Sequence, residues 1–190
     1  MKFNNDMLRL YAVTDRHWTG EKTLYEQVRD VLMGGATCLQ LREKDLDEAS
    51  FYEEAKNIKE LCRLFDVPFI INDNVMLAKE IDADGVHVGQ DDMACAKARE
   101  ILGPDKIIGV SAHTIEEARI AKEQGADYLG VGAIFPTSSK DDAEVLGIKR
   151  LKEMTETVDL PMVAIGGISY DNCLLLKDTG IDGIAVISAL

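Results

Sequence analysis

The sequence predicts an α/β protein whose residues 1–190 form a single (β/α)8 barrel domain, also called a TIM barrel. Two observations predict this fold class. Short apolar runs alternate with segments whose apolar residues recur at helical spacing, from one end of the chain to the other. In addition, a similar short junction between helix and strand recurs four times. Alternating strands and helices are typical of a parallel sheet with helices packed on it.

Eight runs are predicted as strands, because each is short, apolar or β-branched, and bounded by residues that favour turns. They cover residues 8–15, 38–43, 68–73, 85–89, 106–111, 128–134, 161–167 and 183–188.

Seven segments between these runs are predicted as helices from their apolar spacing. In one of them, Thr114 followed by Glu117 is a capping-box pattern, and Gly125 follows the last helical residue. The seven segments are residues 23–33, 47–65, 74–81, 94–102, 114–124, 148–157 and 171–178.

The repeated junctions join a helix end to a strand start about every 40–55 residues, roughly the length of two βα units in a barrel of ~250 residues. A glycine there can adopt the left-handed conformation that ends a helix, so that the strand begins at once. The junctions are Gly35-Ala36-Thr37, Asp82-Ala83-Asp84-Gly85, Gly125-Ala126-Asp127 and Gly180-Ile181-Asp182-Gly183.

An open doubly wound sheet is the alternative architecture. It requires a glycine-rich turn after the first strand, whereas the first strand here ends in Thr14-Asp15-Arg16-His17-Trp18 and has no G-x-G-x-x-G pattern. The closed barrel uses all eight predicted strands and accounts for the fourfold spacing. Because the chain ends at Leu190, directly after the eighth strand, we expect it to lack the eighth helix.

Composition excludes several classes of partner. The chain has 34 acidic and 21 basic residues and a formal net charge of −13, so neither nucleic acid nor an anionic membrane surface is expected to bind. No apolar run approaches the roughly 20 residues of a membrane span, and a signal peptide's apolar stretch is missing. The four cysteines are widely separated and contain no C-x-x-C pair. We expect buried, reduced thiols in a cytoplasmic protein.

Polar residues gather where strands end, which in a barrel is where chemistry takes place. Side chains alternate along a strand, so Gln40, Arg42 and Lys44 share one face while Leu39 and Leu41 share the other. The leucines suit the side facing the helices. Solvated charges at a frayed strand end are the simpler interpretation, but two bases converging on the barrel mouth favour an anion site.

Carboxylates end the next two strands. Asp73 is the last residue of the third strand, and Asp91 and Asp92 follow the fourth. Neighbouring strands lie about 4.8 Å apart, so Asp73 and one of Asp91 or Asp92 could share a cation such as Mg²⁺. Helix capping is the simpler explanation of either residue alone. Their joint position beside Arg42 and Lys44 favours a metal-assisted diphosphate site.

The later strands end in small and hydroxyl-bearing residues. Ser111 ends the fifth strand, and the loop after the sixth can donate several hydrogen bonds and one positive charge to an oxyanion. Many barrels hold phosphate with backbone amides after strands seven and eight, where glycine allows close approach. We therefore expect a second anion site there. These segments contain Thr137, Ser138, Ser139, Lys140, Gly166, Gly167, Ile187 and Ser188.

In chain order, and over nearly the whole chain, these motifs resemble those of the thiamine-phosphate synthase family. The family's first strand is similar to Tyr11-Ala12-Val13-Thr14-Asp15. The other matching motifs are Gln40-Leu41-Arg42-Glu43-Lys44, Ile71-Asn72-Asp73, Ala83 to Asp92, Gly109-Val110-Ser111-Ala112-His113, Phe135-Pro136-Thr137 with Lys140, and Ala164-Ile165-Gly166-Gly167-Ile168.

The resemblance implies a Mg²⁺-dependent enzyme that joins 4-amino-5-hydroxymethyl-2-methylpyrimidine diphosphate to a thiazole ethanol phosphate. The products are thiamine phosphate and diphosphate, formed by a dissociative carbocation route.

The resemblance also implies roles for single residues. Asp73 and Asp92 would bind Mg²⁺, while Arg42, Ser111 and Lys140 would be catalytic. The pyrimidine diphosphate would be bound by the motif Gln40, Leu41, Arg42, Glu43 and Lys44 together with Asn72, Ser111 and Lys140. The thiazole phosphate would be bound by Thr137, Ser138, Ser139, Gly167, Ile187 and Ser188. Ser139 replaces the family's usual threonine but keeps the hydroxyl.

Two alternatives are open at this point. A thiazole tautomerase has a similar barrel but binds only the thiazole phosphate, and a non-catalytic barrel could bind a phosphate ligand. Neither would need Asp73, Asp92, Arg42 and Lys140 together.

Overall fold

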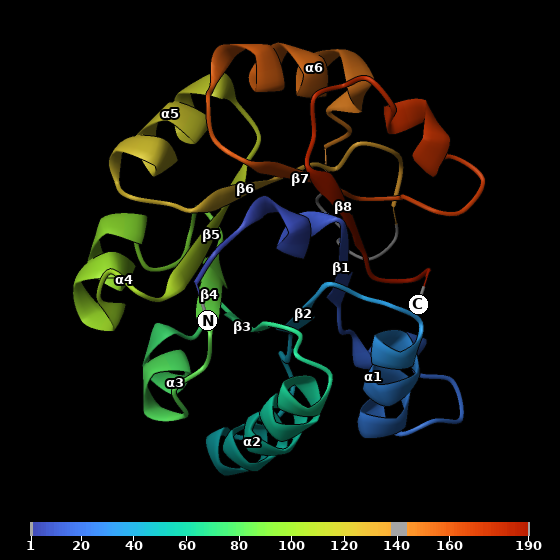
Figure 1. The fold of residues 1–190 in the computed structure, drawn as a ribbon, viewed down its shortest axis with the longest axis vertical. Coiled ribbons are helices and arrows are strands. Elements are labelled where there is room, and N and C mark those ends of the chain that lie inside the picture. The colour runs from blue at the N-terminus through green and yellow to red at the C-terminus, as the bar shows by residue number, and fades with distance from the viewer. Residues whose placement is uncertain (1, 138–143, 190) are drawn as a thin grey trace.

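In the computed structural model, each strand pairs in parallel with the next one along the chain, and β1 also pairs with β8, which closes the sheet into a barrel (Figure 1). The structure describes residues 2–137 and 144–189. The predicted (β/α)8 fold is confirmed. The strands are β1 Leu10–Val13, β2 Cys38–Leu41, β3 Phe69–Asn72, β4 Gly85–Val88, β5 Ile107–Ala112, β6 Tyr128–Val131, β7 Met162–Ile165 and β8 Gly183–Val186.

Helices lie outside the ring of strands (Figure 1). Their ends follow the expected capping chemistry: the hydroxyl of Thr114 accepts the N–H of Glu117 at 3.1 Å. The Glu117 carboxylate, however, accepts the N–H of His113 instead of that of Thr114. The α-helices are α1 Leu24–Met33, α2 Glu48–Leu64, α3 Val75–Glu80, α4 Cys95–Leu102, α5 Ile115–Glu123 and α6 Gly147–Thr157, and two short 3₁₀ helices are η1 Asn5–Leu8 and η2 Arg16–Trp18.

The prediction of a helix at residues 171–178 is wrong in type, because this segment forms only the 3₁₀ helix η3 Cys173–Leu176. Before it, the Asn172 side chain bonds the loop, donating to the Gly167 carbonyl at 2.8 Å. After it, Lys177 is extended and Asp178 is left-handed, with φ 63°. Neither end can continue as an α-helix, so a single short turn remains. Within the described residues, no helix follows β8.

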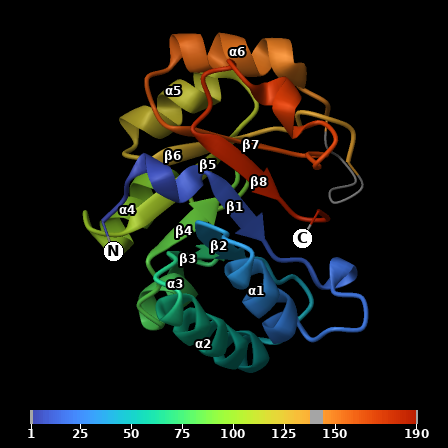
Figure 2. The ribbon, with the colours of Figure 1, turned by 45° about the vertical axis from the view of Figure 1, so that its right-hand side comes forward.

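Buried side chains form two layers on opposite sides of the strands. The outer layer lies between strands and helices and contains Leu39 and Leu41. The inner layer fills the barrel and contains Tyr11 and Tyr128. Met7, from η1, joins the inner layer at the end where the strands begin, opposite the loops that follow them (Figure 2). One end of the barrel is therefore closed, which leaves the other for a ligand.

The repeated junctions lie where the strands begin, and each gives one side-chain oxygen to a neighbouring strand. The acceptors Thr37, Asp84, Asp127 and Asp182 take the N–H groups of Leu10, Phe69, Ile108 and Met162 at 2.9, 2.9, 2.7 and 2.9 Å. These bonds link the odd-numbered strands to the strands beside them. The repeat thus serves the stability of the closed end, not the chemistry of the open one.

The left-handed residue of each junction is mostly the expected glycine, with φ 93° at Gly35, 88° at Gly125 and 85° at Gly180. In the second junction Asp82 takes that role with φ 55°. Gly85 instead belongs to β4, where a Cβ atom would lie 2.2 Å from the carbonyl oxygen of Ile107. Close strand packing explains this glycine.

Candidate active site

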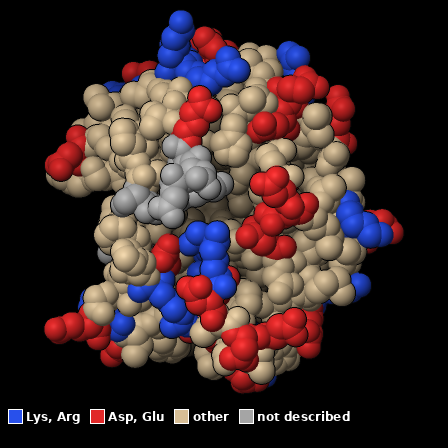
Figure 3. Space-filling view, turned by 180° about the vertical axis from the view of Figure 1, so that it is seen from behind, with Lys and Arg blue, Asp and Glu red and all other residues tan. Residues whose placement is uncertain are grey.

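The open end of the barrel contains a cavity of about 1000 Å³, at the upper end of the usual size range of small-molecule sites. Seen from behind the view of Figure 1, the molecule is hollowed near its centre, with basic side chains beside the hollow and acidic ones across from them (Figure 3). The predicted residues that line this cavity are Gln40, Arg42, Lys44, Asn72, Asp73, Asp92, Ser111, Thr137 and Ile187.

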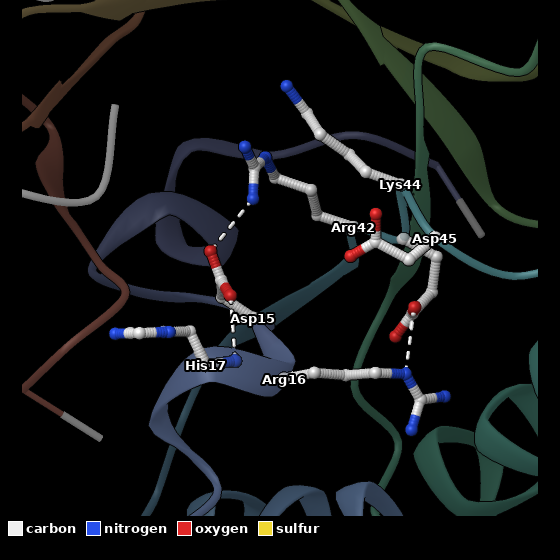
Figure 4. Close-up of a pocket in the computed structure, with 7 residues that line it drawn as sticks. Asp15, Arg16, His17, Arg42, Lys44 and Asp45 are labelled. Carbon is white, nitrogen blue, oxygen red and sulfur yellow. Dashed lines mark hydrogen bonds and ion pairs between the residues drawn. The ribbon is translucent and has the colours of Figure 1, made fainter. Parts of the chain in front are cut away.

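Arg42, just after β2, is held by two side chains that follow β1. Its N–H donates to the Thr14 hydroxyl at 3.0 Å, and its guanidinium Nη1 donates to the Asp15 carboxylate at 2.8 Å. The backbone N–H of His17 donates to the other oxygen of that carboxylate at 3.0 Å. Figure 4 shows the Asp15 contact and the Lys44 side chain extending in the same direction as Arg42. The guanidinium is therefore oriented before any anion binds.

The structure corrects the predicted contacts of Leu41 and Glu43. Leu41 is fully buried in the outer layer, so its side chain cannot reach the cavity. The Glu43 carboxylate pairs with Arg16 at 2.9 Å and lines an adjoining, smaller cavity of about 470 Å³, which shares Arg42 and Lys44 with the first. Burial raises the pKa of Glu43. Both residues share the strand face opposite to Gln40 and Arg42, which is why they point away.

Asp73 and Asp92 are not helix caps. Asn74 caps α3 with its side chain, while α4 begins after Ala94. The Asp92 carboxylate instead accepts the N–H of Gly89 at 2.7 Å, and a Cβ atom on Gly89 would lie 2.9 Å from that carboxylate oxygen. The capping explanation weighed in the sequence interpretation therefore does not account for either carboxylate.

The two carboxylates interact with each other. Burial and the neighbouring Asp92 carboxylate raise the pKa of Asp73 to about 6, although a hydrogen bond from Asn72 and the charge of Lys44 act in the opposite direction. Asp73 also has a left-handed backbone, with φ 62°. Two like charges held together are unfavourable unless a proton or a cation lies between them.

This arrangement fits a divalent cation with few protein ligands. Within residues 2–137 and 144–189, no three histidine, cysteine or acidic side chains converge on one metal position. Mg²⁺ is commonly held by one or two carboxylates, with water and ligand oxygens completing its shell. The Asp73–Asp92 pair can supply such a partial set.

The loop after β7 packs closely on the loop after β6. Gly166 and Gly167 are left-handed, with φ 98° and 63°. The Gly166 carbonyl accepts the N–H of Phe135 at 3.0 Å, and a Cβ atom on Gly167 would lie 2.3 Å from the Pro136 oxygen. Contact between the two loops therefore requires glycine at these positions. Gly166 lines the cavity, and Gly167 comes directly after it.

Some predicted residues are not placed in the cavity wall. Ser138, Ser139 and Lys140 lie outside the described residues. Ser188 is exposed and follows Ile187, which does line the cavity. The roles of these four residues stay predictions.

Three residues to which the sequence analysis gave no role contact residues that it placed in the site. Thr14 and Asp15 hold Arg42, and His87 Nε2 lies 3.0 Å from the Ser111 hydroxyl. For Thr14 and Asp15 a signal existed, because they are polar residues at the end of a predicted strand. His87 lies at an inward-facing position, but a single buried histidine is more often a core residue than a site residue.

Comparison with known proteins identifies relatives over nearly the whole chain. The family model for thiamine monophosphate synthase matches residues 10–190. The thiamine-phosphate synthase of Desulfitobacterium hafniense is 53% identical over 95% of this chain and 88% of its own length. That of Clostridium acetobutylicum is 50% identical over 96% of this chain and 86% of its own length.

Solved structures agree. The thiamine phosphate pyrophosphorylase from Pyrococcus furiosus superposes with a TM-score of 0.90 at 45% identity, covering 97% of this chain and 88% of that one. An N-acetylmannosamine-6-phosphate 2-epimerase from Clostridium perfringens has a TM-score of 0.71 over 97% of this chain and 89% of that one, at 15% identity, which shows a shared fold alone. Among the described residues, no helix is long and apolar enough to cross a bilayer.

Proposed function

The chain belongs to the thiamine monophosphate synthase family and is an enzyme that transfers a pyrimidinylmethyl group, and from this premise we propose how its cavity does so. The proposed substrates are 4-amino-5-hydroxymethyl-2-methylpyrimidine diphosphate and thiazole ethanol phosphate. The bond between the exocyclic carbon and the diphosphate oxygen breaks, and the electron pair leaves with the oxygen. The thiazole nitrogen then bonds to that carbon, giving thiamine phosphate and diphosphate.

The diphosphate would be bound mainly by the half of the cavity from β1 to β4, joined by Ser111 of β5. Arg42 and Lys44 provide positive charge, and Ser111 provides a hydroxyl donor. Lys140, in the loop after β6, would add a further positive charge. Asp73 and Asp92 would hold Mg²⁺, which when bound offsets the negative charge that grows on the departing group.

No general base is needed, because the attacking thiazole nitrogen carries no proton. The chain must align two substrates and keep water from the carbocation. Gln40 and Asn72 would hold the pyrimidine. Gln40 is only 5% exposed, so that ring would sit at the dry, inner end of the cavity.

The thiazole phosphate would occupy the opposite half. Small residues leave room there for a phosphate beside the backbone. The proposed contacts are Thr137, Ser138, Ser139, Gly167, Ile187 and Ser188.

One observation carries this proposal: two mutually repelling carboxylates and two cations, from the loops that follow three different strands, face one cavity. A tautomerase or a passive phosphate-binding barrel has no use for such a combination. A phosphate alone does not need a cation held between carboxylates.

The test is formation of thiamine phosphate from the two purified substrates, with Mg²⁺ or with a chelator. We expect product only with Mg²⁺, together with one diphosphate released per product. Equal product in chelator would remove the metal from the proposal. Conversion of the thiazole phosphate alone, without coupling, would favour the tautomerase.

We also propose that the enzyme works in the reducing environment of the cytoplasm. Cys38, Cys62, Cys95 and Cys173 are all free thiols, and the first three are buried. An oxidising compartment would normally select disulfides instead.

A further inference from the structure

A row of five polar side chains crosses the interior of the barrel below the cavity. The Gln40 amide nitrogen lies 3.0 Å from the Tyr11 hydroxyl, which lies 2.7 Å from the Tyr128 hydroxyl. That hydroxyl lies 3.0 Å from His87 Nδ1, and His87 Nε2 lies 3.0 Å from the Ser111 hydroxyl. The row connects β2 to β5 through β1, β6 and β4 (Figure 1). Both of its ends are residues assigned to the pyrimidine diphosphate.

The fold makes room for this row. A Cβ atom on Gly109 would lie 2.5 Å from His87 Nδ1, and one on Gly130 would lie 3.0 Å from the ring carbon Cε1 of the same histidine. Tyr11 and Tyr128 are each 1% exposed. Two glycines on neighbouring strands thus leave space for one imidazole at a fixed position.

All members of the row are neutral at pH 7. Burial raises the pKa of both tyrosines well above their ordinary value and lowers the pKa of His87 to about 4. Each hydroxyl therefore keeps its single hydrogen, and the imidazole carries one hydrogen on one of its two nitrogens.

These single hydrogens can be followed along the row. The Gln40 amide donates to Tyr11, so the Tyr11 hydrogen is free to go to Tyr128. With that direction, Tyr128 would donate its own hydrogen to His87 Nδ1. Nδ1 would then be an acceptor, and the imidazole hydrogen would sit on Nε2, from where it would be donated to the Ser111 oxygen.

We propose that His87 is a positioning residue that keeps the Ser111 hydroxyl a hydrogen-bond donor toward the diphosphate. Ser111 has one hydrogen. If His87 Nε2 accepted it, Ser111 would present only lone pairs to an anion and would repel it. Because His87 donates, the serine hydrogen stays available for a phosphate oxygen whose charge grows as the bond breaks. The inference rests on the proposed binding of diphosphate at Ser111.

The first test determines which nitrogen of the His87 imidazole carries the hydrogen in the ligand-free enzyme. Nitrogen NMR of labelled protein distinguishes the two tautomers of an imidazole, and the chain has only 3 histidines to assign. We expect the hydrogen of His87 on Nε2. In Tyr128→Phe, which removes the donor to Nδ1, this preference should weaken. A hydrogen on Nδ1 in the unaltered enzyme would overturn the inference without touching the proposed function.

The second test separates a hydrogen bond from mere packing. In His87→Gln the side-chain amide can reach the position of Nε2 and donate to Ser111, whereas in His87→Asn it is too short. We expect His87→Asn to raise KM for the pyrimidine diphosphate and lower turnover, together about tenfold in kcat/KM, and His87→Gln to recover most of it. KM for the thiazole phosphate should not change. If the two variants lose kcat/KM equally, or if the kinetic constants for both substrates are affected equally, His87 has only a structural role.

A double variant distinguishes failure of this inference from failure of the proposed function. If His87 acts through Ser111, His87→Asn has no further effect in a Ser111→Ala background. Additive losses would overturn the inference and leave the diphosphate site intact. If Ser111→Ala alone leaves kcat/KM for the pyrimidine diphosphate unchanged, the proposed position of the diphosphate is wrong.

Discussion

The two halves of the cavity are built differently. The half from β1 to β4 contributes charged side chains, with Arg42, Lys44, Asp73 and Asp92 facing the same space. The described lining of the half from β5 to β8 is mostly small or apolar, and its charged members are Glu144 and Arg150. Glycine and alanine lie at five positions of that second half, which are Gly130, Gly132, Ala133, Gly166 and Ala185.

If the proposed function holds, the difference means that the two anionic groups are bound by two kinds of surface. A metal-assisted diphosphate needs particular charges at particular places, so a single substitution there removes a function. A phosphate bound by backbone amides needs room, so a substitution there acts by filling space. Each half should therefore fail in its own way.

The largest expected effect is in the charged half. Asp92→Ala should lower the rate of coupling by on the order of 100-fold at ordinary Mg²⁺, because one of the proposed metal ligands is lost. Binding of thiazole phosphate should stay within about twofold. Steady-state kinetics over a Mg²⁺ series, with calorimetry for the thiazole phosphate, would measure both.

Asp91→Ala is the matched control, since Asp91 lines the same cavity and the spacing of the strands alone does not separate it from Asp92. The neighbouring carboxylate that raises the pKa of Asp73 is that of Asp92. A greater loss in Asp91→Ala than in Asp92→Ala would show that the metal position is wrong.

The next effect is in the glycine half. Gly167→Ala should destabilise the fold by roughly 2–4 kcal/mol, because the new methyl group meets the Pro136 oxygen in addition to the left-handed strain. Thiazole phosphate affinity should fall at least about tenfold while pyrimidine diphosphate binding persists. Denaturant unfolding and calorimetry measure the two quantities.

Gly147→Ala is its control, because Gly147 is also left-handed, with φ 78°, but has no heavy atom within 4 Å of the Cβ position. It should cost only about 1 kcal/mol, from backbone strain alone. Equal destabilisation by both substitutions would mean that the contact between the loops after β6 and β7 contributes nothing.

A smaller effect concerns the orientation of a cation. Asp15→Ala frees the Arg42 guanidinium, so KM for the pyrimidine diphosphate should rise by about threefold to tenfold with a smaller change in turnover. As a control, Asp30→Ala removes an ion pair between Asp30 on α1 and Lys22, and it should leave KM unchanged. If the two variants behave alike, the Asp15–Arg42 contact has no part in binding.

The smallest effect is on stability. The folded pKa of Asp73, about 6, lies above its unfolded value, so its ionisation weakens the metal-free fold. The stability that protonated Asp73 contributes is fully present below about pH 4 and is lost as pH rises through about 6. Asp73→Asn should therefore raise the metal-free Tm at pH 7 by roughly one or two degrees, and remove the stabilisation by Mg²⁺.

Thermal unfolding with and without Mg²⁺, at pH 5 and pH 7, checks this. In the unaltered enzyme, stabilisation by Mg²⁺ should be weaker at pH 5, because protons compete for Asp73. An Asp73→Asn variant that is less stable than the unaltered, metal-free enzyme at pH 7 would show that the two carboxylates do not repel each other.

Local patterns predicted much of the fold. The strands and six of the seven helices were found from periodicity, because a residue's burial in a regular element repeats with the element's own period. Residues 171–178 show the limit: their spacing is helical, yet Asn172 and Asp178 adopt loop conformations at both ends. The hydrogen bond from the Asn172 side chain to the Gly167 carbonyl cannot be read from the spacing of apolar residues.

The sequence by itself determined the barrel, the family and the charged half of the cavity, because these depend on residue type and on neighbours along the chain. Only the tertiary structure decided that Asp92 is the residue that interacts with Asp73, that Glu43 turns away to Arg16, and that Tyr11 and Tyr128 connect Gln40 to His87. Tyr11 and Tyr128 meet only because closure of the sheet places β1 and β6 so that the two side-chain hydroxyls lie 2.7 Å apart across the interior. Such contacts depend on the position of every strand between them, and no local pattern records that.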